Sequence, residues 1–360
     1  MKSERKLRQL ANPIGVAMIG LGNWSYQLGQ AIRRTPQVEL VSCYTRTPEK
    51  RQKFATAFGC TSASTLEELL ETPAVQAVLI ATPAHVHTEL TVTCARSGLH
   101  VFVEKPMSTS LAGALQMVVA CRENGVVLMV GHEMRRLGSV RAIKELLQDN
   151  ALDQVVAATA AMTLNGRFEP DNWRCHRDSN RGGALMQLGI HPIENLNYLF
   201  GQPQSVRGAF TNVVAPGGID DVGAAVITYQ GGTQAVVSAS YVSPSSQRLS
   251  LYGTRANLYQ VSDMRVWPDA AAVDGNTELT LENGVERRQM PITPRDVLVE
   301  QMEDFAASIR HGRPPETGAR EGLMAVAVVE AALRSAAQGG QVDPGQLIAE
   351  LRDKGAADDR

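Results

Sequence analysis

The chain has 360 residues, which is enough for two domains of about 150 residues each. Apolar residues make up 44% and charged residues 20%, a balance typical of a globular protein. The net charge of -2 excludes a strongly basic surface for nucleic acid or an anionic membrane, and no apolar run is long enough to span a bilayer. Five scattered cysteines, none in C-x-x-C spacing, favour the reducing cytoplasm.

The first part of the chain alternates between short apolar runs and helical patterns. Strands are expected at residues 16–19, 38–44, 74–81, 101–103 and 126–130. Helices are expected between them, at residues 25–34, 48–58, 89–97 and 111–123. This alternation predicts an α/β fold with a parallel, doubly wound Rossmann sheet.

After residue 131 the pattern changes to a series of strands separated by Gly-, Pro- and Ser-rich linkers. The expected strands are 155–163, 206–214, 223–229, 233–240, 248–252 and 256–261. The expected helices are 140–148, 184–200, 295–310 and 321–338. We therefore predict a second, α+β domain with a mostly antiparallel sheet. The predicted boundaries are 1–134, 135–345 and a polar C-terminal tail at 346–360.

The segment Gly20-Leu21-Gly22-Asn23-Trp24-Ser25 joins the first strand to the first helix. Its first glycine permits a tight turn, and its second lets the backbone approach a pyrophosphate at the helix N-terminus. Serine replaces the usual third glycine and is still small enough for close helix–strand packing. The segment predicts dinucleotide binding by Gly20, Gly22, Asn23, Trp24 and Ser25. The alternative is an ordinary glycine-rich turn.

The end of the second expected strand bears on which dinucleotide is bound. An acidic residue there would bind the ribose 2′-hydroxyl of NAD, but the sequence reads Cys43-Tyr44-Thr45-Arg46-Thr47. Arg46 can pair with a 2′-phosphate, aided by the Thr45 hydroxyl, which favours NADP(H). NAD(H) remains the alternative, with Arg46 exposed beside a site that uses backbone contacts.

Glu104-Lys105-Pro106 follows the strand expected at 101–103, and ligands bind at the carboxyl ends of strands in open α/β sheets. A partly desolvated lysine beside the nicotinamide can exchange a proton with a substrate hydroxyl or carbonyl. Glu104 is placed to orient Lys105. The alternative is an ordinary surface lysine.

Several segments together resemble the Gfo/Idh/MocA oxidoreductase family, which includes glucose–fructose oxidoreductase and inositol dehydrogenases. They are residues 20–25, 81–87, 98–106, 172–174, 182–191 and 305–315. The resemblance implies a Rossmann domain followed by a domain for substrate binding and oligomerisation. Its large open sheet would form a homodimer or homotetramer.

The same resemblance implies roles for three residues. Lys105 matches the catalytic lysine of the family, and His191 matches the histidine that works with it. Gln187 stands where many members have an aspartate, and an amide forms hydrogen bonds but does not titrate. Spaced four apart on a helix, Gln187 and His191 share a face and would contact substrate with Lys105. For His191 the alternative is a core histidine bonded to the backbone.

Weaker interpretations concern residues at other strand ends and loops. Thr82, Pro83 and His87 lie where the family contacts its cofactor, although His87 could instead brace the loop. Arg135 and its neighbour Arg136 would hold a substrate anion or cofactor group, or form a surface charge pair.

Trp173 and Arg174 would wall the nicotinamide pocket, or pack structurally. No metal site is expected, because His85 and His87 are two apart with no set of carboxylate and cysteine ligands nearby.

The sequence thus favours an NAD(P)-dependent oxidoreductase acting on a small molecule, a cyclic polyol, sugar or related carbinol, with Lys105 as acid/base. A dihydrodiol dehydrogenase is the enzymatic alternative, since the position of the usual aspartate holds Gln187. A non-catalytic nicotinamide-binding regulator is the alternative of another class, against which the retained Lys105 and His191 argue.

Overall fold

The computed structural model describes residues 12–166, 172–176, 179–267 and 269–358, and the chain forms two compact units. The first unit comprises Met1–Ser108, Gln116–Gly131 and Leu298–Gly322. The second comprises Thr109–Leu115, His132–Val297 and Leu323–Arg360. Each unit therefore combines separate stretches of the chain, whereas the sequence predicts two consecutive domains, 1–134 and 135–345.

The return of 298–322 to the first unit has a local physical cause. Helix α10 (Val297–His311) places the Phe305 ring edge-on to Phe102 of the sheet, with ring centroids 6.0 Å apart. Glu303 accepts a hydrogen bond from Thr35, and Arg310 donates to the Gln37 side chain. No strand–helix periodicity marks such a return, because α10 follows a long stretch of the other unit.

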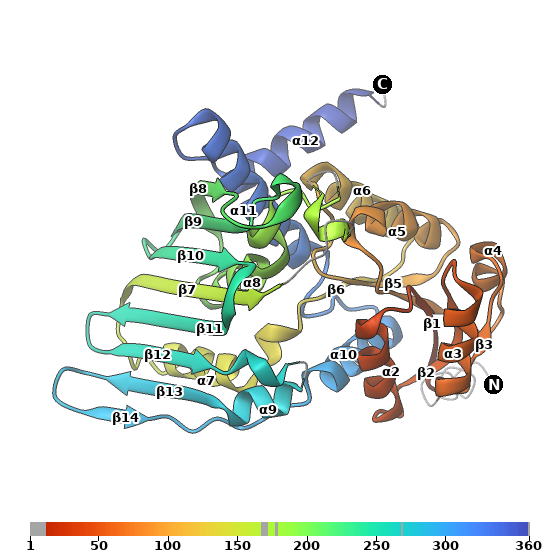
Figure 1. The fold of residues 1–360 in the computed structure, drawn as a ribbon, viewed down its shortest axis with the longest axis horizontal. Helices are drawn as coiled ribbons and strands as arrows, with labels where there is room; N and C mark the ends of the chain where they lie inside the picture. Colours follow the sequence, from red (N-terminus) through yellow and green to blue (C-terminus); the bar gives the residue numbers. More distant parts are fainter. Residues whose placement is uncertain (1–11, 167–171, 177–178, 268, 359–360) are drawn as a thin grey trace. The chain divides into compact units, whose positions relative to one another are not determined.

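The first unit is built on a six-stranded parallel sheet (Figure 1), which confirms the predicted Rossmann architecture. The strand order is β3-β2-β1-β4-β5-β6, so the order reverses beside β1. The strands are β1 (Ile14–Ile19), β2 (Val38–Tyr44), β3 (Thr61–Ser62), β4 (Ala77–Ile80), β5 (His100–Glu104) and β6 (Leu128–Gly131). Only the two-residue β3 was not expected, being too short to show a periodic pattern.

Helices connect the strands of this sheet. They are α2 (Asn23–Arg33), α3 (Pro48–Phe58), α4 (Leu66–Leu70), α5 (His87–Arg96) and α6 (Leu111–Glu123). Helix α3 begins with Pro48 and ends at Gly59, whose φ of 74° is the left-handed conformation that glycine adopts readily. The short helix α4 was not expected from the sequence.

The second unit contains an eight-stranded sheet in the order β14-β13-β12-β11-β7-β10-β9-β8. All neighbouring pairs are antiparallel except β7 and β10, so the predicted mostly antiparallel sheet is confirmed. The strands are β7 (Val155–Asn165), β8 (Pro203–Thr211), β9 (Val222–Tyr229), β10 (Gln234–Ser240), β11 (Val242–Gly253), β12 (Asn257–Ser262), β13 (Thr277–Glu282) and β14 (Arg287–Gln289). The last two were not expected.

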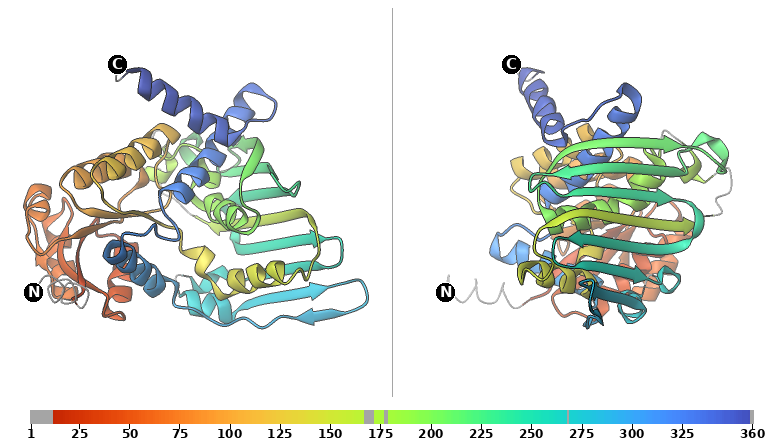
Figure 2. Two further views of the ribbon diagram at one scale, coloured as in Figure 1. Left: turned by 180° about the vertical axis from the view of Figure 1, so that it is seen from behind. Right: turned by 90° about the vertical axis from the view of Figure 1, so that its left-hand side faces the viewer.

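One face of this sheet is covered by α7 (Gly138–Gln148), α8 (Ile190–Phe200) and α11 (Ala319–Gln338), as Figures 1 and 2 show. On that face β9 and β10 present buried, mostly small residues at alternate positions: Gly223, Ala225, Ile227, Ala235, Val237 and Ala239. On the opposite face, in the described part of the chain, no helix covers the exposed Val226 and Val236.

Two helical segments differ from the sequence analysis. The helix expected at 184–200 is a π-helix, η4 (Leu185–Gly189), followed by α8. The expected tail folds as α12 (Pro344–Asp358), while residues 359–360 lie outside the described residues. Asp343 caps α12 by accepting hydrogen bonds from the Gly345 and Gln346 amides, and Leu347 and Ile348 are buried.

Candidate active site

The turn between β1 and α2 requires glycine at its first position. Gly20 has a φ of 88°, and a Cβ there would lie 2.6 Å from Thr82 Cγ2 and 2.7 Å from the Ala81 carbonyl oxygen. The end of β1 therefore lies directly against the end of β4, where the strand order reverses. Dinucleotides bind at this position in doubly wound sheets.

Gly22 and Ser25, the other small residues of this turn, have surroundings that differ from those of Gly20. A Cβ on Gly22 would meet no atom of the described chain beyond its own chain neighbours within 4 Å, so packing does not require glycine there and the space is open to a ligand. Gly22 is the N-cap of α2, whose first amides and dipole favour an anion. Ser25 is fully buried and donates a 2.6 Å hydrogen bond to the Gly22 carbonyl, which ties the turn to the helix. The loop fits a dinucleotide pyrophosphate.

The end of β2 carries an exposed cation on a braced loop. Arg46 is exposed and Thr45 is half-buried. The Arg51 guanidinium donates to the Thr45 carbonyl at 2.7 Å and to the Arg46 carbonyl at 3.4 Å. The loop backbone is held by Arg51, which leaves the Arg46 side chain at the surface.

His87 ties two of the predicted cofactor loops together. Its ring is fully buried, with Nε2 2.9 Å from the Thr82 carbonyl oxygen and Nδ1 3.0 Å from that of Pro106. Burial lowers the pKa of His87 to about 4, although both carbonyls favour the protonated ring. His87 therefore positions the Thr82 loop against the Glu104–Pro106 segment, and a contact between His87 and the cofactor stays a prediction.

Lys105 is half-buried directly after β5. Glu104 is 6% exposed, and its Oε2 accepts a 3.2 Å hydrogen bond from the Lys105 backbone amide. A Cβ on Gly131, at the end of β6, would lie 2.8 Å from Glu104 Oε1, so glycine makes room for this carboxylate. The contact fixes the backbone from which the lysine side chain extends.

In the second unit, the two candidate residues Gln187 and His191 are both buried, 7% and 4% exposed. Gln187 lies within the π-helix η4 and His191 in the first turn of α8. Interruptions of this kind are frequent at functional sites. His191 Nδ1 lies 3.8 Å from Oε1 of Glu133, a residue of the 3-10 helix η2 (Glu133–Arg136).

Arg135 forms a buried ion pair with Glu194 of α8. Its guanidinium carbon lies 4.7 Å from the centre of the Tyr198 ring, which Lys144 also approaches. This environment favours a role in holding η2 against α8, and substrate contact by Arg135 stays a prediction.

Trp173 and Arg174 belong to a short 3-10 turn, η3 (Trp173–Cys175). The Arg174 guanidinium stacks on the indole at 4.4 Å from its centroid, and burial lowers the pKa of Arg174. Asn172 accepts a hydrogen bond from the Arg174 amide, and Asn180 donates one to the Arg174 carbonyl. The pair is half-buried and held by these contacts, which fits either a pocket wall or structural packing.

Sequence reasoning missed Glu133 and Glu194. Both are buried carboxylates, 1% and 2% exposed, with partners far away in the sequence. One signal was present, because Glu133 follows the carboxyl end of β6 just as Lys105 follows that of β5.

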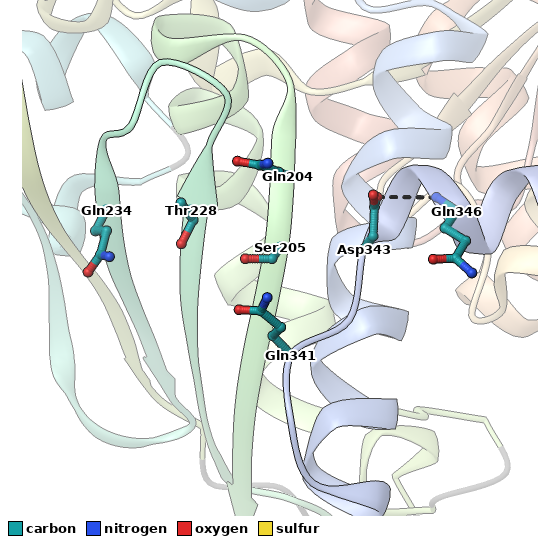
Figure 3. A pocket seen from close by; sticks show the side chains of 7 residues that line it. All are labelled: Gln204, Ser205, Thr228, Gln234, Gln341, Asp343 and Gln346. Carbon is teal, nitrogen blue, oxygen red and sulfur yellow. Dashed lines mark hydrogen bonds between the residues drawn. The ribbon is translucent and has the colours of Figure 1, made fainter.

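A pocket of about 560 Å³ lies at one edge of the second unit's sheet (Figure 3). Its lining is polar and comes from β8, β9, β10, the segment before α12 and the first turn of α12: Gln204, Ser205, Thr228, Gln234, Gln341, Asp343 and Gln346. No predicted site residue lines it. Among the described residues, no group of three or more metal-ligating side chains occurs, and no helix could cross a membrane.

Comparison with known proteins identifies both parts of the chain. Residues 14–132 match the Gfo/Idh/MocA oxidoreductase family with its NAD-binding Rossmann fold, and residues 140–259 match the C-terminal domain of the same family. The 1,5-anhydro-D-fructose reductase of Ensifer adhaerens is 27% identical over 314 residues, covering 86% of this chain and 92% of the relative.

Solved structures agree with this. A candidate NADPH-dependent oxidoreductase from Desulfitobacterium hafniense superposes with a TM-score of 0.90 at 32% identity, covering 94% of this chain and 99% of that one. A levoglucosan dehydrogenase in complex with NADH shares the fold, with a TM-score of 0.81 at 20% identity over 92% and 99% of the two chains. The chain therefore belongs to the Gfo/Idh/MocA family and is an NAD(P)-dependent dehydrogenase or reductase.

Proposed function

We propose that the protein catalyses reversible hydride transfer between a nicotinamide cofactor and a carbinol or carbonyl carbon of a cyclic polyol or sugar. The observation that carries this is the position of Lys105 at the carboxyl end of β5, tied through His87 to the loop that packs on Gly20. Relatives named for sugar reduction or oxidation support the substrate class.

Each proposed residue has a distinct task. When bound, the nicotinamide supplies the hydride donor or acceptor. Lys105 Nζ takes the hydroxyl proton during oxidation and returns it during reduction. His191 assists this transfer, and Gln187 orients the substrate through amide hydrogen bonds. Glu104 holds the backbone of Lys105.

NADP(H) is the proposed cofactor, with NAD(H) as the alternative. The support is the exposed Arg46 at the end of β2, where no carboxylate stands to bind a ribose 2′-hydroxyl. Gly22, Asn23 and Trp24 would surround the pyrophosphate, while the buried Ser25 braces their turn through its hydrogen bond to Gly22. Thr82 and Pro83 would lie nearer the nicotinamide. Trp173 and Arg174 are proposed to contact the nicotinamide as well.

The protein is proposed to act in the cytoplasm as a homodimer or homotetramer formed through the open face of the eight-stranded sheet. Val226, Val236 and Val261 are 41%, 45% and 36% exposed on their strands, so this face offers apolar side chains to a second copy of the chain. Light scattering on the wild type and on Val236→Lys measures the assembly, and a monomeric wild type contradicts it.

Turnover of NADPH or NADP⁺ against polyols, sugars and dihydrodiols tests the function. Lys105→Ala should lower kcat by about 10²- to 10⁴-fold while the dissociation constant for NADPH is retained. Lys50→Ala, an exposed lysine on α3, is the matched control. Unchanged turnover in Lys105→Ala refutes the role of Lys105.

The alternatives give different results in the same assay. Turnover of dihydrodiols alone favours the dihydrodiol dehydrogenase. Tight NADPH binding without turnover of any compound favours the regulator.

A further inference from the structure

Gln187 lies in η4, four residues before His191 of α8, and the resemblance to the family places it where many members have an aspartate. A histidine that exchanges protons needs a neighbour that fixes which ring nitrogen carries the hydrogen. The sequence around η4 and the start of α8 supplies no acid, since the nearest one along α8 is Glu194. Glu194 is already engaged by Arg135.

Glu133 reaches the same imidazole from a different element. It lies on η2, 1% exposed, with Oε1 3.8 Å from Nδ1 of the 4% exposed His191. The separation exceeds that of a direct hydrogen bond, so the carboxylate acts on the imidazole through its charge. Both groups are buried, and an electrostatic interaction between buried groups is screened little by solvent.

The other charged groups of η2 are Arg135 and Arg136, both buried. The ion pair with Glu194 offsets the charge of Arg135, and the Arg135 guanidinium faces the Tyr198 ring. The Glu133 carboxylate lies 3.8 Å from Nδ1 of His191 and is not offset by the Arg135–Glu194 pair.

We propose that Glu133 is a positioning residue that holds His191 in the tautomer protonated at Nδ1, leaving the Nε2 lone pair to exchange a proton or hydrogen bond with substrate. A hydrogen on Nδ1 is attracted by the carboxylate, whereas a lone pair there is repelled. Glu133 thereby supplies, from η2, the carboxylate that position 187 lacks. The catalytic consequence rests on the proposed function, while the tautomer does not.

The first test needs no turnover. Nitrogen-15 spectra of the imidazoles distinguish the two tautomers, and His191→Asn assigns the signal among the seven histidines. The wild type should show His191 protonated at Nδ1, and Glu133→Gln should shift the population toward Nε2. Glu133→Asp keeps the carboxylate and should retain the wild-type form at least in part. The same tautomer in wild type and Glu133→Gln overturns the proposal.

The second test is kinetic and uses a substrate turned over by the wild type. Glu133→Gln should lower kcat/KM about 10- to 100-fold and move the acidic limb of its pH profile to lower pH. Adding Gln187→Asp to Glu133→Gln places a carboxylate four residues before His191. The double variant should have a kcat/KM at least tenfold higher than that of Glu133→Gln alone. A uniform loss without movement of the limb, and without restoration, indicates a purely structural Glu133 and refutes the proposal.

Discussion

The candidate residues of the two units are held in different ways. In the first unit they follow strand ends and are fixed by backbone contacts, as with the Gly20 turn against Ala81 and the carbonyls that face His87. In the second unit Arg135 is instead fixed by a buried side-chain pair with Glu194, 59 residues apart. The first arrangement depends on local conformation, and the second depends on mutual charge compensation in a buried environment.

The largest effect should come from breaking a buried pair of the second unit. Arg135→Met leaves the Glu194 carboxylate buried without its cation and should lower the free energy of unfolding by about 3–5 kcal/mol. Arg265→Met, which removes the exposed partner of Asp263, should destabilise the protein far less, because solvent screens that ion pair. Denaturant titration of both variants measures the difference, and equal losses would show that burial of the pair is unimportant.

The second largest effect should be a loss of folding stability at low pH, caused by protonation of His87 in the first unit. Since burial lowers the pKa of His87 from 6.5 to about 4, the unfolded chain binds a proton in this interval that the folded chain does not. The stabilisation is complete above pH 6.5 and is lost as pH falls toward 4, by about 3 kcal/mol.

Urea unfolding at several pH values measures that loss. His87→Gln should flatten the dependence, whereas His311→Gln, an exposed histidine at the end of α10, should leave it unchanged. A slope that is identical in wild type and His87→Gln would assign the acid sensitivity elsewhere.

Substitutions of Gly20 and Gly22, in the turn after β1, should have different effects, one on stability and the other on cofactor affinity. Gly20→Ala places a methyl group against Thr82 and the Ala81 carbonyl at positive φ, and should cost about 2 kcal/mol of stability. Gly22→Ala meets no protein atom, so its stability should be close to wild type while NADPH affinity falls. Thermal melts and fluorescence titration distinguish them; wild-type NADPH affinity in Gly22→Ala would argue against pyrophosphate binding at this turn.

The smallest expected effect concerns cofactor preference. Arg46→Asp should lower the ratio of NADP to NAD affinity by about tenfold or more, since a charge-assisted hydrogen bond to a phosphate contributes about 1.5–3 kcal/mol. Lys50→Asp makes the same charge change on α3 and should leave the ratio unaltered. An unchanged ratio in Arg46→Asp removes Arg46 from the 2′-phosphate site.

The sequence by itself determined the parallel sheet, the turn at Gly20 and the position of Lys105, because strand periodicity, glycine spacing and strand ends are local properties of the chain. It also predicted the mostly antiparallel second sheet, although not its strands β13 and β14. The return of α10 to the first unit and the π-helical turn at Gln187 had no local pattern.

Only the tertiary structure decided the surroundings of His191 and Arg135. Glu133 and Glu194 look like ordinary surface carboxylates in the sequence, yet both are buried when η2 packs on α8. A buried charge is tolerated only where a partner compensates it, and that partner is chosen by packing between distant segments rather than by spacing along the chain.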